Sequence, residues 1–294
     1  MKKRAKFASS DYQYSSLPAT RKEVFNDVYR HNFLNIFKCG IALLVSFLPI
    51  LIFMVIMEVG KIGMTLEFYS EDDLFGVLFV WDIITNVGFS VLSVFVVLIL
   101  SGICRVIKLL VFQEGIDFFY DFKRGIKENF KQFIFLYLFY IFIYLATYFT
   151  QLFIFRELVG IVMIALFHII FTPALAWIYL SINVYETKVF EHVKNGYFFF
   201  FRNVGWSILF LALLMWPFVL NFLFYQNIIV TNLNFFIILI KNTVLVFMML
   251  FYYPALLILS TLFSNYKFDL FINKDNYPEI YRKGLYDKKN RNKA

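Results

Sequence analysis

The stretch FIFLYLFYIFIYLATYFTQLFIF, from Phe133 to Phe155, decides the fold class of this chain. It contains no charged residue, and it is longer than the roughly 20 helical residues that cross the hydrocarbon core of a bilayer. Its apolar run is continuous rather than alternating, which favours a transmembrane helix over a strand of a membrane β-barrel. The sequence therefore predicts an all-α, polytopic membrane protein.

Five further segments have the same character. In chain order the predicted spans are Ile41–Val59, Ile83–Cys104, Phe133–Phe155, Leu158–Ile182, Val204–Tyr225 and Phe235–Leu259. Apolar residues make up 61% of the 294 residues and charged residues 16%, and a soluble fold of this size has too little interior to bury that much apolar surface. We expect three helical hairpins in a membrane domain of residues 35–263, between basic polar tails at 1–34 and 264–294.

The basic residues predict the orientation of these spans. Lys and Arg concentrate in the two tails and in the segments after the second and fourth spans, which all fall on one side of the membrane. Only Lys61, Arg156 and Lys241 of the 28 basic residues fall elsewhere. Cytoplasmic loops carry the excess of positive charge, so the sequence predicts that both termini are cytoplasmic. The same charges predict contact with anionic lipid headgroups, and no nucleic-acid partner is expected.

Two segments on the predicted cytoplasmic side have amphipathic patterns. In Glu114–Phe130, the apolar residues Phe119, Phe122, Ile126 and Phe130 recur at helical spacing and share one face. This pattern predicts either an interfacial helix lying in the headgroups or a helix packed under the bundle. The segment Thr187–Phe201 is a weaker copy of it.

A short pattern recurs before three of the outward-going spans. The tripeptides His31-Asn32-Phe33, Glu128-Asn129-Phe130 and Arg202-Asn203-Val204 each precede such a span. The pattern indicates either an internal repeat or coincidence in a sequence rich in Phe and Asn.

Sequence motifs of catalysis and metal binding are absent. The chain has no nucleophile elbow, no glycine-rich phosphate loop and no histidine-based metal pattern. We therefore predict no catalytic residue, no metal ligand and no cofactor, and we expect that the protein is not an enzyme. Cys39 and Cys104 are predicted to be packing residues with reduced thiols.

Polar residues gather in the outer third of the predicted bundle. They are Glu58, Asp82, Asn86, Gln151, Asn221 and Lys241. Lys241 lies deep enough to need water or a partner, and Glu58 or Asp82 would supply the opposite charge. One interpretation is a polar vestibule open to the outside. The other is snorkelling near the helix ends together with ordinary interhelical hydrogen bonds.

His168 is an ionisable residue near the midplane of the fourth span. Intramembrane ionisable groups are costly and often functional, so this histidine is a candidate for proton relay or substrate binding. The alternative is a neutral histidine that is hydrogen-bonded to a neighbouring helix.

Part of the chain resembles a known family. An inward helix ends at Arg105, an amphipathic stretch contains Phe118-Phe119, and a basic residue, Lys127, precedes Glu128-Asn129-Phe130. This succession resembles the second helix and the following cytoplasmic segment of YesL-like bacterial membrane proteins, and the Asn32-Phe33 opening of the first span is similar too. The resemblance implies an inner-membrane protein of undefined activity, in some cases associated with carbohydrate-uptake systems.

Three function classes remain. The first is a non-catalytic accessory or scaffold protein with a membrane-protein partner, which the basic cytoplasmic side favours. The second is a small-solute transporter or permease subunit, which requires the outer polar residues to form a site. The third is an intramembrane enzyme, for which the sequence offers no paired catalytic groups.

Overall fold

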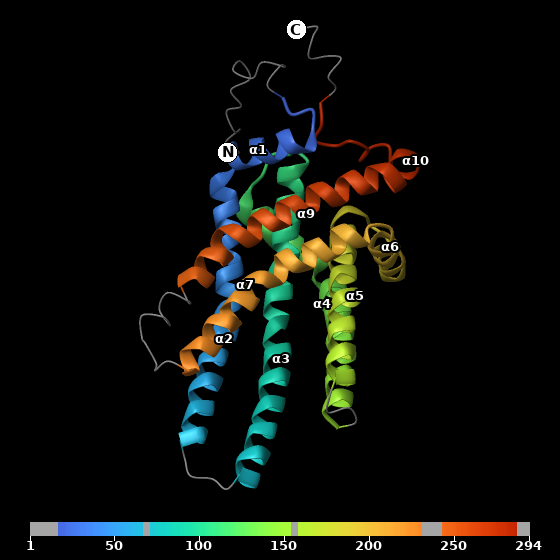
Figure 1. Ribbon diagram of the computed structural model, residues 1–294. Coiled ribbons are helices and arrows are strands. Elements are labelled where there is room, and N and C mark those ends of the chain that lie inside the picture. The colour runs from blue at the N-terminus through green and yellow to red at the C-terminus, as the bar shows by residue number, and fades with distance from the viewer. Residues whose placement is uncertain (1–16, 67–70, 154–157, 231–242, 287–294) are drawn as a thin grey trace.

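The computed structural model describes residues 17–66, 71–153, 158–230 and 243–286, and over these ranges it is helical with short connections (Figure 1). The helices are α1 (Arg21–His31), α2 (Phe33–Leu66), α3 (Glu71–Val111), α4 (Phe118–Phe153), α5 (Leu158–Val184), α6 (Val189–Arg202), α7 (Val204–Val230), α9 (Tyr253–Phe268) and α10 (Lys274–Asn276), and two π-helical turns, η2 (Met248–Tyr252) and η3 (Asp269–Asn273), flank α9. The all-α prediction is confirmed for the part of the chain that the structure describes.

Five helical segments of the described chain are long and apolar enough to cross a membrane. They are Phe33–Met57, Gly76–Val111, Phe118–Leu152, Val162–Val184 and Thr243–Asn276. Each overlaps a predicted span, so the chain is a multi-pass membrane protein by helix length and composition.

The last two predicted spans differ from the structure. The segment Val204–Tyr225 lies in α7, which qualifies as a span only together with α6, and these two helices meet at a bend of 98°. The described chain thus has five candidate spans, or six if the bent pair is one. Residues 235–242 of the sixth predicted span lie outside the described residues, and the helical backbone continues beyond Leu259 to Asn276, across the expected domain boundary at residue 263.

Both ends of the described chain lie at one end of the bundle, which we call the proximal end (Figure 1). The backbone N–H of Tyr286 donates a hydrogen bond of 2.9 Å to the carbonyl oxygen of Pro18, so the two ends meet. The opposite end, where α2 finishes and α3 begins, is the distal end.

Two of the three expected hairpins are regular. Figure 1 shows α2 beside α3 and α4 beside α5, whereas α7 and α9 cross the bundle obliquely. The third pair consists of α7 and the region of η2 and α9. Tyrosines join it, because the hydroxyl groups of Tyr252 and Tyr253 donate hydrogen bonds to the carbonyl oxygens of Leu213 and Leu214 on α7. The α9 region also packs into the apolar cluster that α1, α2 and α3 form.

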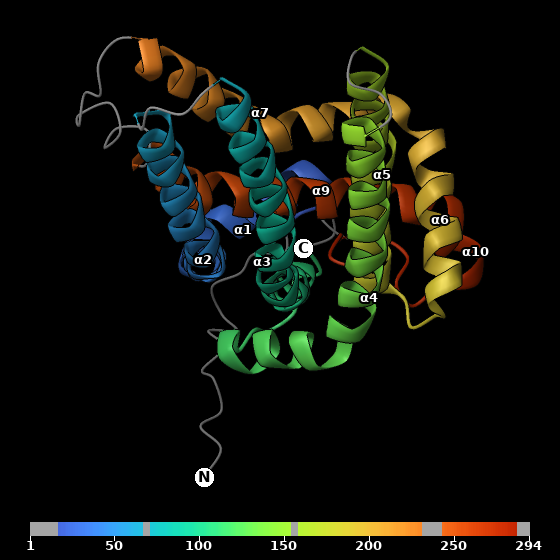
Figure 2. The ribbon, with the colours of Figure 1, turned by 90° about the horizontal axis from the view of Figure 1, so that it is seen from below.

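The predicted amphipathic segment is the first part of α4, which runs across the proximal end before the helix turns along α5 (Figure 2). Phe118 and Phe122 pack against the core on this segment, while the Phe119 side chain is 73% exposed. The segment is therefore packed under the bundle, as one interpretation expected. Its packed face is rotated from the predicted one, because Phe119 points away from the core.

Asparagine stands at two of the three predicted junctions as a helix cap. Asn32 ends α1 and Asn203 ends α6, and the backbone N–H of each donates to a carbonyl of the preceding turn. Asn129 instead lies within the continuous helix α4. The repeated pattern thus marks a change of chain direction before α2 and before α7.

Candidate functional site

Four tyrosines line one face of α4. Tyr137, Tyr140, Tyr144 and Tyr148 recur every three or four residues, so they share one side of the helix. Hydrogen bonds from three of them reach polar side chains of α3 and α5. The face is therefore turned toward these helices, with Tyr148 buried and the other three tyrosines partly buried.

The distal part of this site joins α4 to α3. The hydroxyl of Tyr148 donates a hydrogen bond to the Oδ2 carboxylate oxygen of Asp82, and that of Tyr144 donates to Oδ1 of Asn86 at 2.9 Å. Asn86 in turn donates from Nδ2 to the backbone carbonyl of Asp82 at 2.9 Å. The exposed Asp82 side chain thus accepts hydrogen bonds from one neutral donor on each of two helices, Tyr148 of α4 and Asn86 of α3.

The inner part of the site joins α4 to α5. The hydroxyl of Tyr140 lies 3.3 Å from Nδ1 of His168 and 3.0 Å from Oγ1 of Thr172. The ring of Tyr144 lies 5.6 Å from the imidazole, centroid to centroid, and so links the two parts. We call Asp82, Asn86, Tyr140, Tyr144, Tyr148, His168 and Thr172 together the polar column.

The structure brings His168 together with two of the residues that the sequence analysis assigned to the vestibule. Asp82 and Asn86 belong to the same column as His168. His168 is thus hydrogen-bonded to the neighbouring helix α4, and its role in proton relay or substrate binding stays a prediction. Gln151 lies three positions beyond Tyr148 on α4, and the described hydrogen bonds do not join it to the column.

The other predicted vestibule residues cannot be placed in the column. The backbone of Glu58 lies in α2 and that of Asn221 in α7, but both side chains lie outside the described set, as does the whole of Lys241. Pairing of Lys241 with Glu58 or Asp82 therefore stays a prediction.

Sequence reasoning missed the tyrosines that build the column. Their signal was present, because the spacing from Tyr137 to Tyr148 is the same pattern of threes and fours that identified the amphipathic segment. In a chain with 19 Tyr and 41 Phe, that pattern does not stand out.

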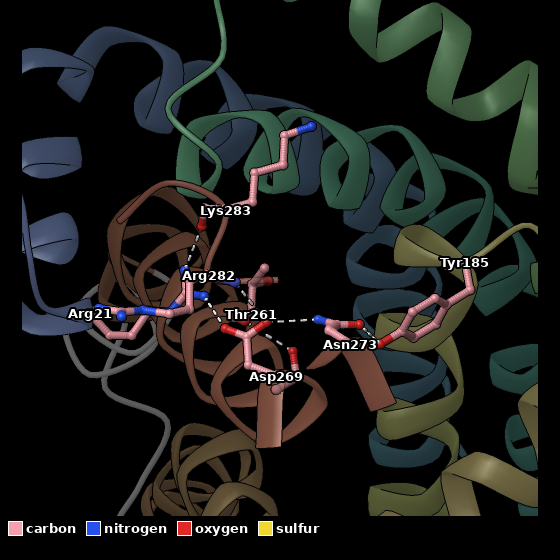
Figure 3. A network of polar contacts seen from close by, with 8 residues as sticks. Arg21, Tyr185, Thr261, Asp269, Asn273, Arg282 and Lys283 are labelled. Atoms are coloured by element: carbon pink, nitrogen blue, oxygen red, sulfur yellow. Dashed lines mark hydrogen bonds and ion pairs between the residues drawn. The ribbon is translucent and has the colours of Figure 1, made fainter. Parts of the chain in front are cut away.

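A second polar network lies at the proximal end (Figure 3). Nη2 of Arg21 on α1 lies 2.7 Å from Oδ2 of Asp269 on η3, and Nη1 donates to the backbone carbonyl of Lys283 at 3.0 Å. Only 15% of the arginine side chain and 11% of the aspartate side chain is exposed. This ion pair therefore forms largely out of contact with solvent.

The carboxylate of Asp269 also binds neighbours along the chain. Its Oδ1 accepts from Nδ2 of Asn273 at 2.8 Å and from the backbone N–H of Arg282 at 3.2 Å. The hydroxyl of Tyr185, just after α5, donates to Oδ1 of Asn273 at 2.6 Å. We call Arg21, Asp269, Asn273 and Tyr185 the proximal network. They connect α1, η3 and the end of α5 with the C-terminal segment, which here means the backbone around Arg282 and Lys283.

Burial shifts the ionisation of two groups in this network. Burial lowers the pKa of the Arg21 guanidinium, whereas the negative charge of Asp269 raises it. The guanidinium remains protonated, because the pKa of arginine lies far above neutral pH. Burial also raises the pKa of the Tyr185 phenol, with a further increase from the negative charge of Asp269. The phenol therefore remains a donor to Asn273 at neutral pH.

The described residues hold no cluster of three or more His, Cys, Asp or Glu that could ligate a metal ion. A small cavity lies between α5, α7 and α9, beside the hydrogen bond of 3.0 Å from Nε1 of Trp177 to Oγ of Ser207. About 10 Å³ of it is open to the centre of a water molecule, which is room for about one water. It is too small for an organic ligand.

Comparison with known proteins found no match to the chain among protein-family models, curated proteins or solved structures.

Proposed function

We propose that this multi-pass protein resides in a bacterial plasma membrane with both termini cytoplasmic, and that it is a non-catalytic accessory or scaffold protein for a membrane-protein partner. The observation that carries the proposal is the proximal network. By joining α1, η3, the C-terminal segment and α5, it forms a fixed platform from elements far apart in the sequence.

The platform has the chemistry of a docking surface for an acidic partner. Val24 and Val28 of α1 are fully buried against the bundle, while Lys22 and Arg30, on the opposite face of the helix, are exposed. Because the network already fixes α1, a partner would not need to order it on binding, which lowers the entropic cost of association. From the resemblance to YesL-like proteins, we propose that this partner belongs to a carbohydrate-uptake system.

The docking proposal is tested by crosslinking in the membrane followed by purification in mild detergent. We expect one partner to be recovered in stoichiometric amount with the wild-type chain, and to be lost with the variant Lys22→Glu/Arg30→Glu. The matched control Lys194→Glu changes the charge of α6 instead and should retain the partner. Recovery of the wild-type chain alone, after effective crosslinking, would contradict the proposal.

The polar column favours a second candidate function, passage of a small polar solute. It joins the ionisable side chains of Asp82 on α3 and His168 on α5 to tyrosines of α4, and ionisable groups within membrane helices are often functional. In this alternative the column would be the polar site in the outer half of a transporter or permease subunit.

Thiol labelling tests whether water reaches the column. Asn86→Cys lies within it, whereas Ile84→Cys lies two residues away on α3 with a side chain that is 46% exposed on the outer surface of the helix. Both native cysteines are buried, so they give little background. Solute passage predicts that an impermeant thiol reagent added outside modifies Asn86→Cys faster than Ile84→Cys. Full protection of Asn86→Cys would exclude it.

A further inference from the structure

Helix α6 raises a question that the hydropathy pattern does not answer. It meets α7 at 98°, so the two helices form either a broken span or a helix lying along the membrane followed by an oblique one. Three exposed charged side chains occur on α6, those of Glu191, Lys194 and Arg202. Charges are costly in the hydrocarbon core, so a place at the membrane surface suits α6 better than a transmembrane one.

Contacts with α5 fix the rotation of α6 about its own axis. His192 and Phe199 are fully buried, and a β-carbon at Gly196 would overlap the Ile178 side chain of α5. Oγ of Ser181 on α5 lies 2.9 Å from Nδ1 of His192. Because one face of α6 is held against the bundle in this way, the side chains on its other face have a defined direction.

The free face of α6 has an apolar edge and a charged edge. Phe190 and Phe201 are 78% and 65% exposed, and at about 100° per residue they fall within about 20° of each other around the helix. Glu191 and Arg202 lie about 100° further round, whereas Lys194 lies only about 40° from Phe190, beside the apolar edge. With the buried face, this makes one sector for the protein, an apolar sector bordered by Lys194, whose long side chain reaches toward the headgroups, and a charged sector that holds Glu191 and Arg202.

Arg202 is supported by aromatic rings beneath it. Its guanidinium carbon lies 4.2 Å from the ring centroid of Phe271 on η3 and 5.8 Å from that of Phe198. Stacking on an aromatic face leaves the edges of a guanidinium free to donate hydrogen bonds. The Arg202 side chain is exposed, and the described contacts give it no carboxylate partner, so its donors face outward.

We propose that α6 lies flat in the headgroup region of the leaflet at the proximal end, with Phe190 and Phe201 among the acyl chains and with Lys194 and Arg202 on the phosphates of anionic phospholipids. A planar guanidinium matches phosphate geometry, and an amphipathic helix with basic and aromatic edges is the form that binds at such interfaces. This inference goes beyond the accessory role and does not depend on it.

Depth measurements test the position of α6. Single cysteines replacing Phe190 or Phe201 are labelled with an environment-sensitive fluorophore in nanodiscs of phosphatidylglycerol and phosphatidylcholine. We expect brominated lipids to quench both labels strongly and aqueous iodide to quench them weakly. A label at Lys22→Cys on α1 is the control, and there iodide should quench strongly. Strong iodide quenching on α6 would overturn the interfacial position and would indicate a face for a protein partner.

Lipid titrations test the phosphate contacts. Native mass spectrometry of the purified protein gives apparent dissociation constants for phosphatidylglycerol and phosphatidylcholine. Each basic residue near an anionic surface strengthens binding by about fivefold, so we expect about fivefold weaker phosphatidylglycerol binding for Arg202→Gln and for Lys194→Gln. Glu191→Gln, which removes a negative charge from the same helix, should not weaken it, and phosphatidylcholine binding should not respond. Equal phosphatidylglycerol affinity in wild type and both variants of the basic residues would refute the headgroup site.

Discussion

At Asp269, one carboxylate receives three hydrogen-bond donors from three parts of the chain: Arg21, Asn273 and the backbone of Arg282. Asn273 lies four residues after Asp269 in the π-helical turn η3, and its Nδ2 donates to the Asp269 carboxylate. A π-turn is an uncommon distortion, often found at functional sites. Here the turn contains the two polar side chains that contact Arg21 of α1 and Tyr185.

Removal of Arg21 should destabilise the protein strongly. Arg21→Leu leaves the Asp269 carboxylate largely buried without its cation, which typically costs about 3 kcal/mol in the free energy of unfolding. Thermal unfolding in detergent micelles measures the change against Lys22→Leu, an exposed neighbour for which we expect a change within about 0.5 kcal/mol.

The double variant Arg21→Leu/Asp269→Asn distinguishes two contributions to the free energy of unfolding. One is the lost attraction between the two side chains, and the other is the cost of leaving the Asp269 carboxylate charged and unpaired. It should be more stable than Arg21→Leu alone, because no uncompensated carboxylate remains. If the double variant lost the sum of the two single effects, the two side chains would not be coupled.

At the scale of elements, the crossing of α3 and α4 depends on two glycines. A β-carbon at Gly125 would lie 2.7 Å from Cβ of Arg105 and 3.1 Å from the α-carbon of Gly102. The close approach also places Arg105 beside Glu128 in an ion pair, while Nε of Arg124 bonds the same carboxylate at 2.6 Å. The first part of α4 therefore lies across α3 with almost no space between the backbones.

A larger residue at this crossing should force the helices apart. We expect Gly125→Val to lower the free energy of unfolding by about 1 to 3 kcal/mol through overpacking. Gly205→Ala on α7 is the matched control, because no atom lies within 4 Å of the added carbon, and the better helix propensity of alanine should leave stability equal or higher. Thermal unfolding of both variants checks the prediction. Unchanged stability of Gly125→Val would mean that the crossing adjusts freely.

Helix existence was predictable here, whereas helix direction and rotation were not. The run from Phe133 to Phe155 and its counterparts have a local hydropathy signal that any long apolar helix would give. The bend at Asn203 depends on contacts such as Gly196 with Ile178, which join separate helices. The packed face of the first part of α4 depends in the same way on where α3 lies, so the sequence pattern alone gave a rotated face.

The polar sites illustrate the same limit. Asp82, Asn86 and His168 were recognisable as polar residues within apolar spans, but their meeting through the tyrosines of α4 required the register of three helices. The ion pair of Arg21 with Asp269 joins residues 248 positions apart. No spacing rule within one helix could have indicated it.

At the scale of the whole molecule, the hydrogen bond between Tyr286 and Pro18 and the proximal network place both ends of the described chain together. Fusions test this arrangement and the proposed orientation at once. A reporter that is active only in the cytoplasm should be active at the N-terminus and after Ala294, and a periplasm-dependent reporter should be inactive at both. Opposite results at the two ends would contradict the shared side, and periplasmic activity at both would reverse the orientation.

The meeting of Tyr286 with Pro18 has a consequence for how the fold tolerates cutting. The described part of the chain closes almost into a ring, so a short peptide bridge in place of the two tails could join Tyr286 to Pro18 without moving any helix. The exposed turn at Gly115 between α3 and α4 has nothing within 4 Å of an added carbon, which makes it a natural place to open that ring. Such a circular permutant would insert its helices into the membrane in a new order, although its native contacts would be the same. Its folding would show whether the order of insertion matters to this fold.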